Sequence, residues 1–219
     1  MTFAMRAAAA AVAALVLAQP AAATLVEVNP CSATCTITST PPNPVSPDPN
    51  DGVLLLWNER QNVTLTAPLA VDRVFDTGAS FVSGSSGNFM LAAGTVVSSH
   101  YVQWDPSGAS GSIQATITAD SQIFAFITAD VKLFNSDDIL GLPGVDYNDF
   151  TNRGLESGDS TSFSGQSVAI DWTATSPGDW TRLITAYSPS ADVPVPAALP
   201  LLAAALGAFG LAARRRQAR

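Results

Sequence analysis

Residues 112–129 read SIQATITADSQIFAFITA, and this stretch decides the fold class. In its first half, apolar side chains from Ile113 to Ile117 alternate with polar ones, which predicts a strand with one buried face and one solvent-exposed face. The second half is apolar on both faces and predicts a central strand of a sheet. Asp120 and Ser121 lie between the halves and predict the two-residue turn of a hairpin.

The same strand signals recur before and after this stretch. Short apolar or alternating runs begin at Val53, Val63 and Val168, and a last one begins at Trp180. Turns rich in glycine, proline and serine separate the runs, and no segment among them shows sustained helical periodicity. The sequence therefore predicts an all-β domain at residues 53–190, an antiparallel β-sandwich that is jelly-roll-like.

Residues 24–52 form a segment rich in cysteine and proline in front of this domain. Cys31 and Cys35 are separated by three residues, whereas redox-active pairs are usually separated by two. In an oxidising compartment their spacing predicts a small local disulfide. Five prolines between residues 41 and 49 remove backbone donors and predict an extended loop.

Residues 1–23 have the three parts of a secretory signal peptide. Arg6 precedes an apolar run of 12 residues, and small residues that include Ala21 and Ala23 follow Pro20. We expect a signal helix that is too short to remain as a membrane span, and cleavage after Ala23.

A second apolar run of 19 residues, at 195–213, predicts a C-terminal transmembrane helix, because its length matches a hydrocarbon core. The basic cluster Arg214, Arg215 and Arg216 follows this run and is expected on the cytoplasmic side. All 18 acidic residues lie between residues 24 and 192, against five basic ones, so the exported part is strongly acidic. Such an acidic surface argues against nucleic acid as a partner.

The C-terminal segment at residues 191–219 also contains a short proline motif, which consists of Val193, Pro194, Val195, Pro196 and Ala197. The order of proline motif, apolar run and arginine cluster resembles the PEP-CTERM class of bacterial sorting signals. It is closest to the VPLPA type, with a valine in place of the leucine. The resemblance covers about the last 27 residues of the chain.

This resemblance implies a partner and a destination. Proteins with such tails are sorted by an exosortase in the inner membrane of Gram-negative bacteria that make extracellular polysaccharide, and they are cleaved near the proline motif. We therefore expect an exported cell-surface or matrix protein with a structural or adhesive role, associated with exopolysaccharide and without enzymatic activity. The other interpretation of the tail is an ordinary membrane anchor that no enzyme cleaves.

A short motif at residues 74–80, VFDTGAS, resembles the active-site loop of aspartic peptidases, including the retropepsin-like kind. The resemblance implies that Asp76 is the catalytic acid and base of a homodimer, because the chain carries the motif once. Arg73 interrupts the apolar strand that would lead into such a loop. The other interpretation is a turn that ends a strand, where aspartate and glycine are common. A peptidase is therefore the second alternative function.

An acidic segment at residues 136–159 suggests calcium as a candidate ligand, because carboxylates are hard oxygen donors. Its six acidic residues include Glu156 and Asp159, and the candidate ligands that we single out are Asp137, Asp138, Asp146 and Asp149. The spacing of an EF-hand is absent, and a solvated acidic loop is the other interpretation. No other cofactor is expected.

Aromatic side chains suggest a further alternative, a calcium-dependent carbohydrate-binding module. The four tryptophans, Trp57, Trp104, Trp172 and Trp180, either stack on sugars at one exposed face or fill the core of the sandwich. The single histidine, His100, lies in a predicted strand, and we expect it to be packed rather than catalytic.

Overall fold

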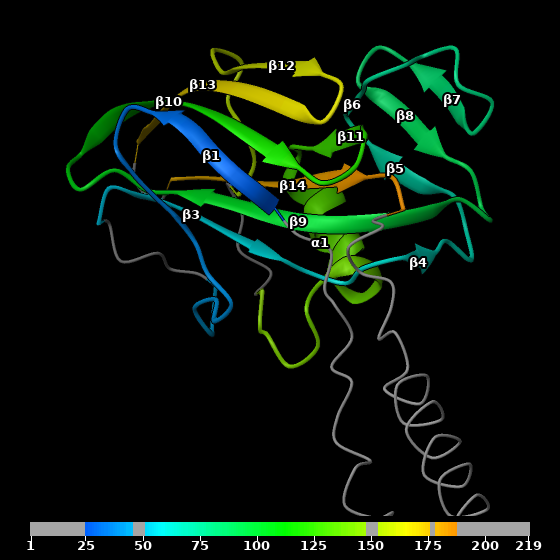
Figure 1. The fold of residues 1–219 in the computed structure, drawn as a ribbon, viewed down its shortest axis with the longest axis horizontal. Coiled ribbons are helices and arrows are strands. Elements are labelled where there is room, and N and C mark those ends of the chain that lie inside the picture. The colour runs from blue at the N-terminus through cyan, green and yellow to red at the C-terminus, as the bar shows by residue number, and fades with distance from the viewer. Residues whose placement is uncertain (1–24, 46–50, 148–152, 176–177, 188–219) are drawn as a thin grey trace, which may run out of the picture. The chain divides into compact units, whose positions relative to one another are not determined.

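The computed structural model describes residues 25–45, 51–147, 153–175 and 178–187, which form an all-β architecture with one short helix (Figure 1). This confirms the expectation of an all-β domain built from antiparallel sheets. In chain order the elements are β1 (Leu25–Cys31), β2 (Thr34–Ile37), β3 (Val53–Asn58), β4 (Val63–Thr64), β5 (Leu69–Val71), β6 (Arg73–Val74), β7 (Val82–Ser85), β8 (Asn88–Leu91), β9 (Val96–Trp104), β10 (Ser110–Ala119), β11 (Ile123–Ile127), α1 (Asp130–Leu140), β12 (Ser160–Ser164), β13 (Ser167–Thr175) and β14 (Asp179–Thr185).

Two sheets make up most of the domain. The smaller sheet has the strand order β1-β10-β13-β12, and the larger sheet has the order β2-β3-β9-β14-β11-β6, with β4 paired to β9. A third, three-stranded sheet has the order β5-β8-β7. Among the described strand pairs only β2 and β3 run parallel, and every other pair is antiparallel.

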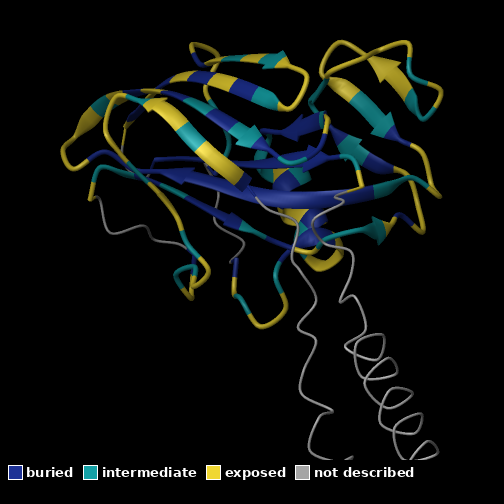
Figure 2. Cartoon of the chain, viewed as in Figure 1, coloured by how far each residue is buried: buried dark blue, intermediate teal, exposed yellow. Residues whose placement is uncertain are grey.

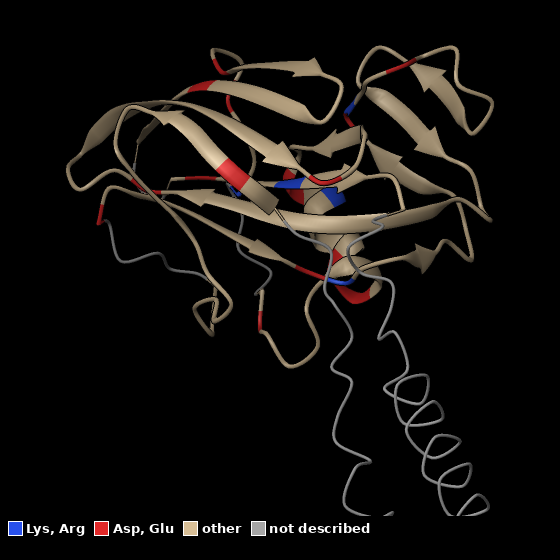
Figure 3. Ribbon diagram, viewed as in Figure 1, with Lys and Arg blue, Asp and Glu red and all other residues tan. Residues whose placement is uncertain are grey.

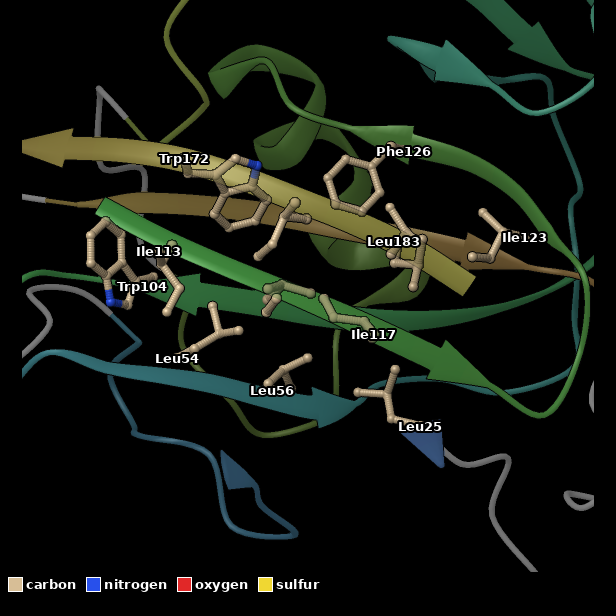
Figure 4. Close-up of a cluster of buried hydrophobic side chains, with 14 of the residues drawn as sticks. Leu25, Leu54, Leu56, Trp104, Ile113, Ile117, Ile123, Phe126, Trp172 and Leu183 are labelled. Carbon is tan, nitrogen blue, oxygen red and sulfur yellow. The ribbon is translucent and has the colours of Figure 1, made fainter. Parts of the chain in front are cut away.

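The smaller sheet has one buried face and one wet face. Residues of β10 and β13 alternate between buried and exposed along each strand, as Figure 2 shows. The buried side chains, among them Ile113, Ile117 and Trp172, pack against Leu54 and Leu183 of the larger sheet (Figure 4). This core between the two sheets is what the alternating pattern of the sequence predicts.

The central strands of the larger sheet are buried on both faces. Strand β14 is buried along its whole length, and β9 is buried from its second residue onward (Figure 2). Its second face packs against Leu133 and Leu140 of α1, Tyr147, and the three-stranded sheet. Helix α1 and the three-stranded sheet therefore form a second layer on this face, so that the domain has a hydrophobic core on each side of the larger sheet.

The predicted hairpin at Asp120 and Ser121 is wrong. Strand β10 pairs with β1 and β13 in the smaller sheet, whereas β11 pairs with β14 and β6 in the larger one. The short connection carries the chain from one sheet to the other. The physical reason lies in the two patterns, because a strand with one apolar face suits the half-exposed sheet and a strand with two apolar faces suits the covered sheet.

Helix α1 was not expected, since its residues lack an amphipathic pattern. Leu133 and Leu140 are buried, but Val131 and Phe134 are exposed on the same helix. The residue before the helix, Ala129, provides no side-chain cap. Local signals are therefore weak, and tertiary contacts hold the helix in place.

The cysteine- and proline-rich segment contributes to both sheets instead of preceding them. Strand β1 pairs with β10 in the smaller sheet, and β2 pairs with β3 in the larger sheet. Cys31, the last residue of β1, forms a disulfide with Cys35 of β2. The bond therefore joins neighbouring edge strands at the point where the chain passes between sheets.

The predicted features of the two chain ends lie outside the described residues. These are the signal peptide with Ala21 and Ala23, the transmembrane helix at 195–213, the proline motif from Val193 to Ala197, and the arginine cluster. Among the residues that the structure describes, no helix has both the length and the apolar character needed to cross a membrane.

Candidate functional site

A buried ion pair connects two strands of the larger sheet, β14 and the end of β3. Arg182, on β14, points toward α1 and donates two hydrogen bonds to Glu59, from Nε to Oε2 at 2.6 Å and from Nη2 to Oε1 at 2.7 Å. Both side chains are 0% exposed. This bidentate geometry is the strong form of an arginine–carboxylate pair. Because both groups are buried, removing either one would leave the charge of the other uncompensated.

Asp137 of α1 extends the pair into a network of four charges. Its Oδ1 accepts a hydrogen bond from Nη2 of Arg182 at 3.0 Å, and its Oδ2 accepts one from Nη1 of Arg153 at 2.8 Å. Two arginines and two carboxylates leave the network without net charge. Because Asp137 belongs to the helix, the network fastens α1 to the sheet.

Polar and aromatic side chains complete the surroundings of the network. Ser136 accepts a hydrogen bond from Arg182, and the hydroxyl of Tyr101 accepts one from Nη2 of Arg153 at 2.9 Å. The guanidinium of Arg182 also lies 5.2 Å from the ring centre of Tyr101 and 5.4 Å from that of Tyr147. Burial raises the pKa of Tyr101 to about 12, so its hydroxyl stays protonated. We interpret this network as a structural clamp.

A second group of acidic side chains lies at one end of the sandwich. Glu156 and Asp159 come from the segment before β12, and Asp179 is the first residue of β14. One ligand atom of each residue lies within 4.8 Å of the others. Asp159 and Asp179 are buried, whereas Glu156 is exposed. Such a set of oxygen donors is able to hold a hard cation.

Asp179 is the unusual member of this group. Its side chain is 0% exposed, no N–H group of the described residues donates to its carboxylate oxygens, and its polar neighbours are the carboxyl groups of Glu156 and Asp159. Burial, together with the neighbouring carboxyl groups of Glu156, Asp159 and Asp105, raises the pKa of Asp179 to about 9.

A cleft of about 380 Å³ opens beside the C-terminal end of α1. Its walls include the exposed ring of Phe134, the guanidinium-bearing Arg60, and the acidic residues Asp138 and Asp146. Tyr147 separates the cleft from the buried core. An aromatic ring beside charged groups is a combination that binding sites for polar ligands use. Figure 3 shows acidic and basic parts of the ribbon side by side around α1.

The structure redistributes the residues that the sequence singled out for calcium. Asp137 is engaged by two arginines, and Asp138 and Asp146 line the cleft without forming a metal-binding group among the described residues. Asp149 lies outside the described residues. The acidic segment does contribute Glu156 and Asp159 to a cluster, but their partner Asp179 was missed, because it opens an apolar strand and looks like part of a turn.

Asp76 lies on an exposed turn. Its Oδ1 accepts a hydrogen bond from the backbone N–H of Gly78 at 2.8 Å, which is the geometry of an Asx turn. Asp76 also lines a hollow of about 140 Å³, together with Phe75, Phe81 and Phe124. The structure therefore contains the strand-ending turn that the second interpretation of the motif expects.

The four tryptophans are core residues. All of them are at most 3% exposed, which removes them as a platform for sugar stacking. His100 is buried as well, on the face of β9 that meets the smaller sheet. The side-chain oxygen of Asn58 accepts a hydrogen bond from the backbone N–H of Leu25, which fixes the orientation of the Asn58 amide. The same oxygen lies 2.8 Å from Nδ1 of His100, and because an amide oxygen only accepts, Nδ1 carries the ring proton. The remaining nitrogen, Nε2, accepts from Thr185.

We predict that replacing one member of the buried ion pair strongly destabilises the protein. Glu59→Gln keeps the shape of the side chain but leaves an unbalanced positive charge on Arg182, which should lower the free energy of unfolding by about 3–5 kcal/mol. Urea denaturation measures the loss. The control is Glu27→Gln at an exposed position, which should change stability by less than about 0.5 kcal/mol. Equal effects of the two variants would contradict the clamp.

We predict that His100 makes the protein less stable in acid. Burial lowers the pKa of His100 from 6.5 to about 4, although the charge of Asp120 acts in the opposite direction. Between these values the unfolded chain binds a proton that the folded chain does not, so stability is present above the unfolded pKa and is lost as the pH falls toward the folded pKa. The loss should be about 3 kcal/mol between about pH 7 and pH 4.

The measurement is urea denaturation at both pH values for the protein and for His100→Gln. Other titrating groups contribute equally to both chains and cancel in the difference. The variant should lose about 3 kcal/mol less than the parent on acidification. The same loss in both chains would show that His100 is not the responsible group.

Comparisons with known proteins add no functional assignment: no family model matches the chain, and no curated protein or solved structure matches it either. Function must therefore be inferred from the residues themselves. The features available for that inference are the disulfide between the sheets, the cleft beside Phe134 and the acidic group around Asp179.

Proposed function

We propose that the protein is an exported, non-catalytic domain of the cell surface or extracellular matrix, sorted through its C-terminal segment by an exosortase. The observation that carries the proposal is the disulfide between Cys31 and Cys35, because such bonds persist in oxidising compartments outside the cytoplasm. The signal-like N-terminus and the motif, apolar run and arginine cluster of the tail point to the same destination.

The proposal includes a jelly-roll-like arrangement of the sandwich. Two consecutive pairs of strands support it, because β10 and β11 lie in opposite sheets, and so do β13 and β14. Such connections across the sandwich are typical of jelly rolls and of the surface domains that use them.

We further propose that the domain binds exopolysaccharide in the cleft beside α1. Phe134 is 53% exposed at the edge of the cleft, where a sugar ring can stack on its face. Arg60 and Asp138 offer a donor and an acceptor for sugar hydroxyl groups next to it. This retains a carbohydrate-binding module as the closest alternative, with Phe134 in the role first considered for the tryptophans.

The peptidase alternative has less support. A dimeric aspartic peptidase requires its catalytic carboxyl group in a cleft shared with a second chain. The exposed carboxylate of Asp76 instead caps the turn that contains it. Asp76→Ala would test the alternative directly, since it abolishes any acid proteolysis that depends on this residue.

We predict that the tail is processed during export. In the native host, cell fractionation and intact mass should find a species outside the inner membrane that begins at Thr24 and lacks the apolar run. Replacing both Pro194 and Pro196 by alanine should trap unprocessed protein in the inner membrane. Pro189→Ala, just before the motif, serves as the control. An uncleaved tail in the parent protein would make it an ordinary anchored domain.

We predict that Phe134→Ala weakens binding to exopolysaccharide from the host about fivefold to tenfold, because it removes roughly 1–1.5 kcal/mol of aromatic contact. The matched control is Val131→Ala on the same helix, where the side chain is 69% exposed and does not line the cleft. Isothermal titration calorimetry measures both affinities. Unchanged binding by Phe134→Ala would refute the cleft as the sugar site.

A further inference from the structure

The acidic group at Asp179 brings together separate parts of the chain. Asp179 opens β14 of the larger sheet, directly opposite Trp104 of β9. Asp159 lies before β12 and accepts a hydrogen bond from the backbone N–H of Thr173, in β13 of the smaller sheet. Glu156 is exposed and connects the group to solvent. The group therefore lies where the ends of the two sheets meet.

The buried carboxyl group of Asp179 is expected to destabilise the fold when no ion is bound. A carboxyl group that is fully buried, receives no hydrogen bond from an N–H donor among the described residues and has only other carboxyl groups as polar neighbours costs free energy. Its neighbours increase the cost, since Glu156 and Asp159 are also acidic. A cation between these three side chains would remove both the repulsion and the missing contacts.

Asp159 is held in position for such a ligand. Its Oδ1 accepts the N–H of Thr173 at 2.8 Å, and its Oδ2 accepts the N–H of Glu156 at 2.9 Å. Each carboxylate oxygen retains a second lone pair. Backbone donors of this kind orient a metal-ligating carboxylate without competing for the ion.

We propose that Glu156, Asp159 and Asp179 bind a calcium ion. Donors that are all carboxylate oxygens favour a hard cation over zinc or copper. Two oxygens at calcium bond lengths of about 2.3–2.6 Å from one ion lie up to about 5 Å apart, which the 4.8 Å limit of this group satisfies. The exposed side of Glu156 leaves room for the water ligands that complete the coordination shell. The proposal does not depend on the polysaccharide site.

The bound ion would connect the two sheets at one end of the sandwich. Asp159 is fixed to β13 and Asp179 belongs to β14. The backbone before Asp179 is tightly confined, because Gly178 has φ +98° and a Cβ there would lie 2.6 Å from the carbonyl oxygen of Trp104. Calcium would thus bind to carboxylates whose backbone positions are already fixed, and it would stabilise the folded domain outside the cell.

The test is thermal unfolding of the full chain after treatment with EDTA, with and without CaCl₂. For an affinity typical of extracellular sites, about 10⁻⁴ M, addition of about 10 mM CaCl₂ should raise the Tm by roughly 5–10 °C. Asp179→Asn should lose this shift. The same substitution at an exposed acid outside both proposed sites, Asp171→Asn in β13, is the matched control and should retain it.

Three outcomes would overturn the proposal. A parent protein with the same Tm in CaCl₂ and in EDTA would mean that Asp179 is satisfied by a proton alone. A calcium shift that survives in Asp179→Asn, or that disappears in Asp171→Asn, would place the ion elsewhere. An equal shift with MgCl₂ would contradict selectivity for calcium.

A second variant guards against misfolding of the first. Glu156→Gln changes an exposed side chain and should leave the fold intact, as near-identical circular dichroism would show. Its calcium affinity, measured by isothermal titration calorimetry, should fall about tenfold or more, since the removal of one ligand typically costs that much. Unchanged affinity in a folded Glu156→Gln protein would exclude Glu156 as a ligand.

Discussion

The ion pair between Arg182 and Glu59 is the constraint on which much of the domain depends. An arginine cannot give up its charge when it is buried, so every element around it has to supply compensation. Asp137 of α1 accepts hydrogen bonds from both Arg182 and Arg153. Tyr101 contacts both arginines as well: its hydroxyl accepts a hydrogen bond from Arg153, and its ring faces the guanidinium of Arg182. The helix stays on the sheet because its acidic residue completes this network.

The network also explains why the larger sheet tolerates so many polar residues. With a core on each face, β9 and β14 are almost entirely inaccessible to water, so partners for their polar side chains have to come from the protein itself, and Asp179 and Thr181 lack hydrogen-bond donors among the described residues. His100 finds partners in Asn58 and Thr185 on one face. Arg182 does so on the other. The smaller sheet needs no such devices because its outer face is wet.

The segment around Arg153 links the clamp to the acidic group. The side chain of Arg153 enters the network, while its carbonyl oxygen accepts the N–H of Trp180, the residue after Asp179. Glu156 and Asp159 follow within the same segment. Arg153 and two of the three carboxylates therefore belong to one short segment, which contacts both the network around Arg182 and the start of β14.

The sequence by itself determined the class of fold and the strand faces, because a period of two depends only on neighbouring residues, as in β10 and β13. It also determined the partner of Cys31, since the chain has one other cysteine. Only the tertiary structure decided that β10 and β11 part into different sheets, that α1 forms without an amphipathic pattern, and that Asp179 joins Glu156 and Asp159. Each of these depends on contacts between residues far apart in the chain. The conformational preferences of neighbouring residues do not specify which distant side chain will neutralise a charge or cover an apolar face.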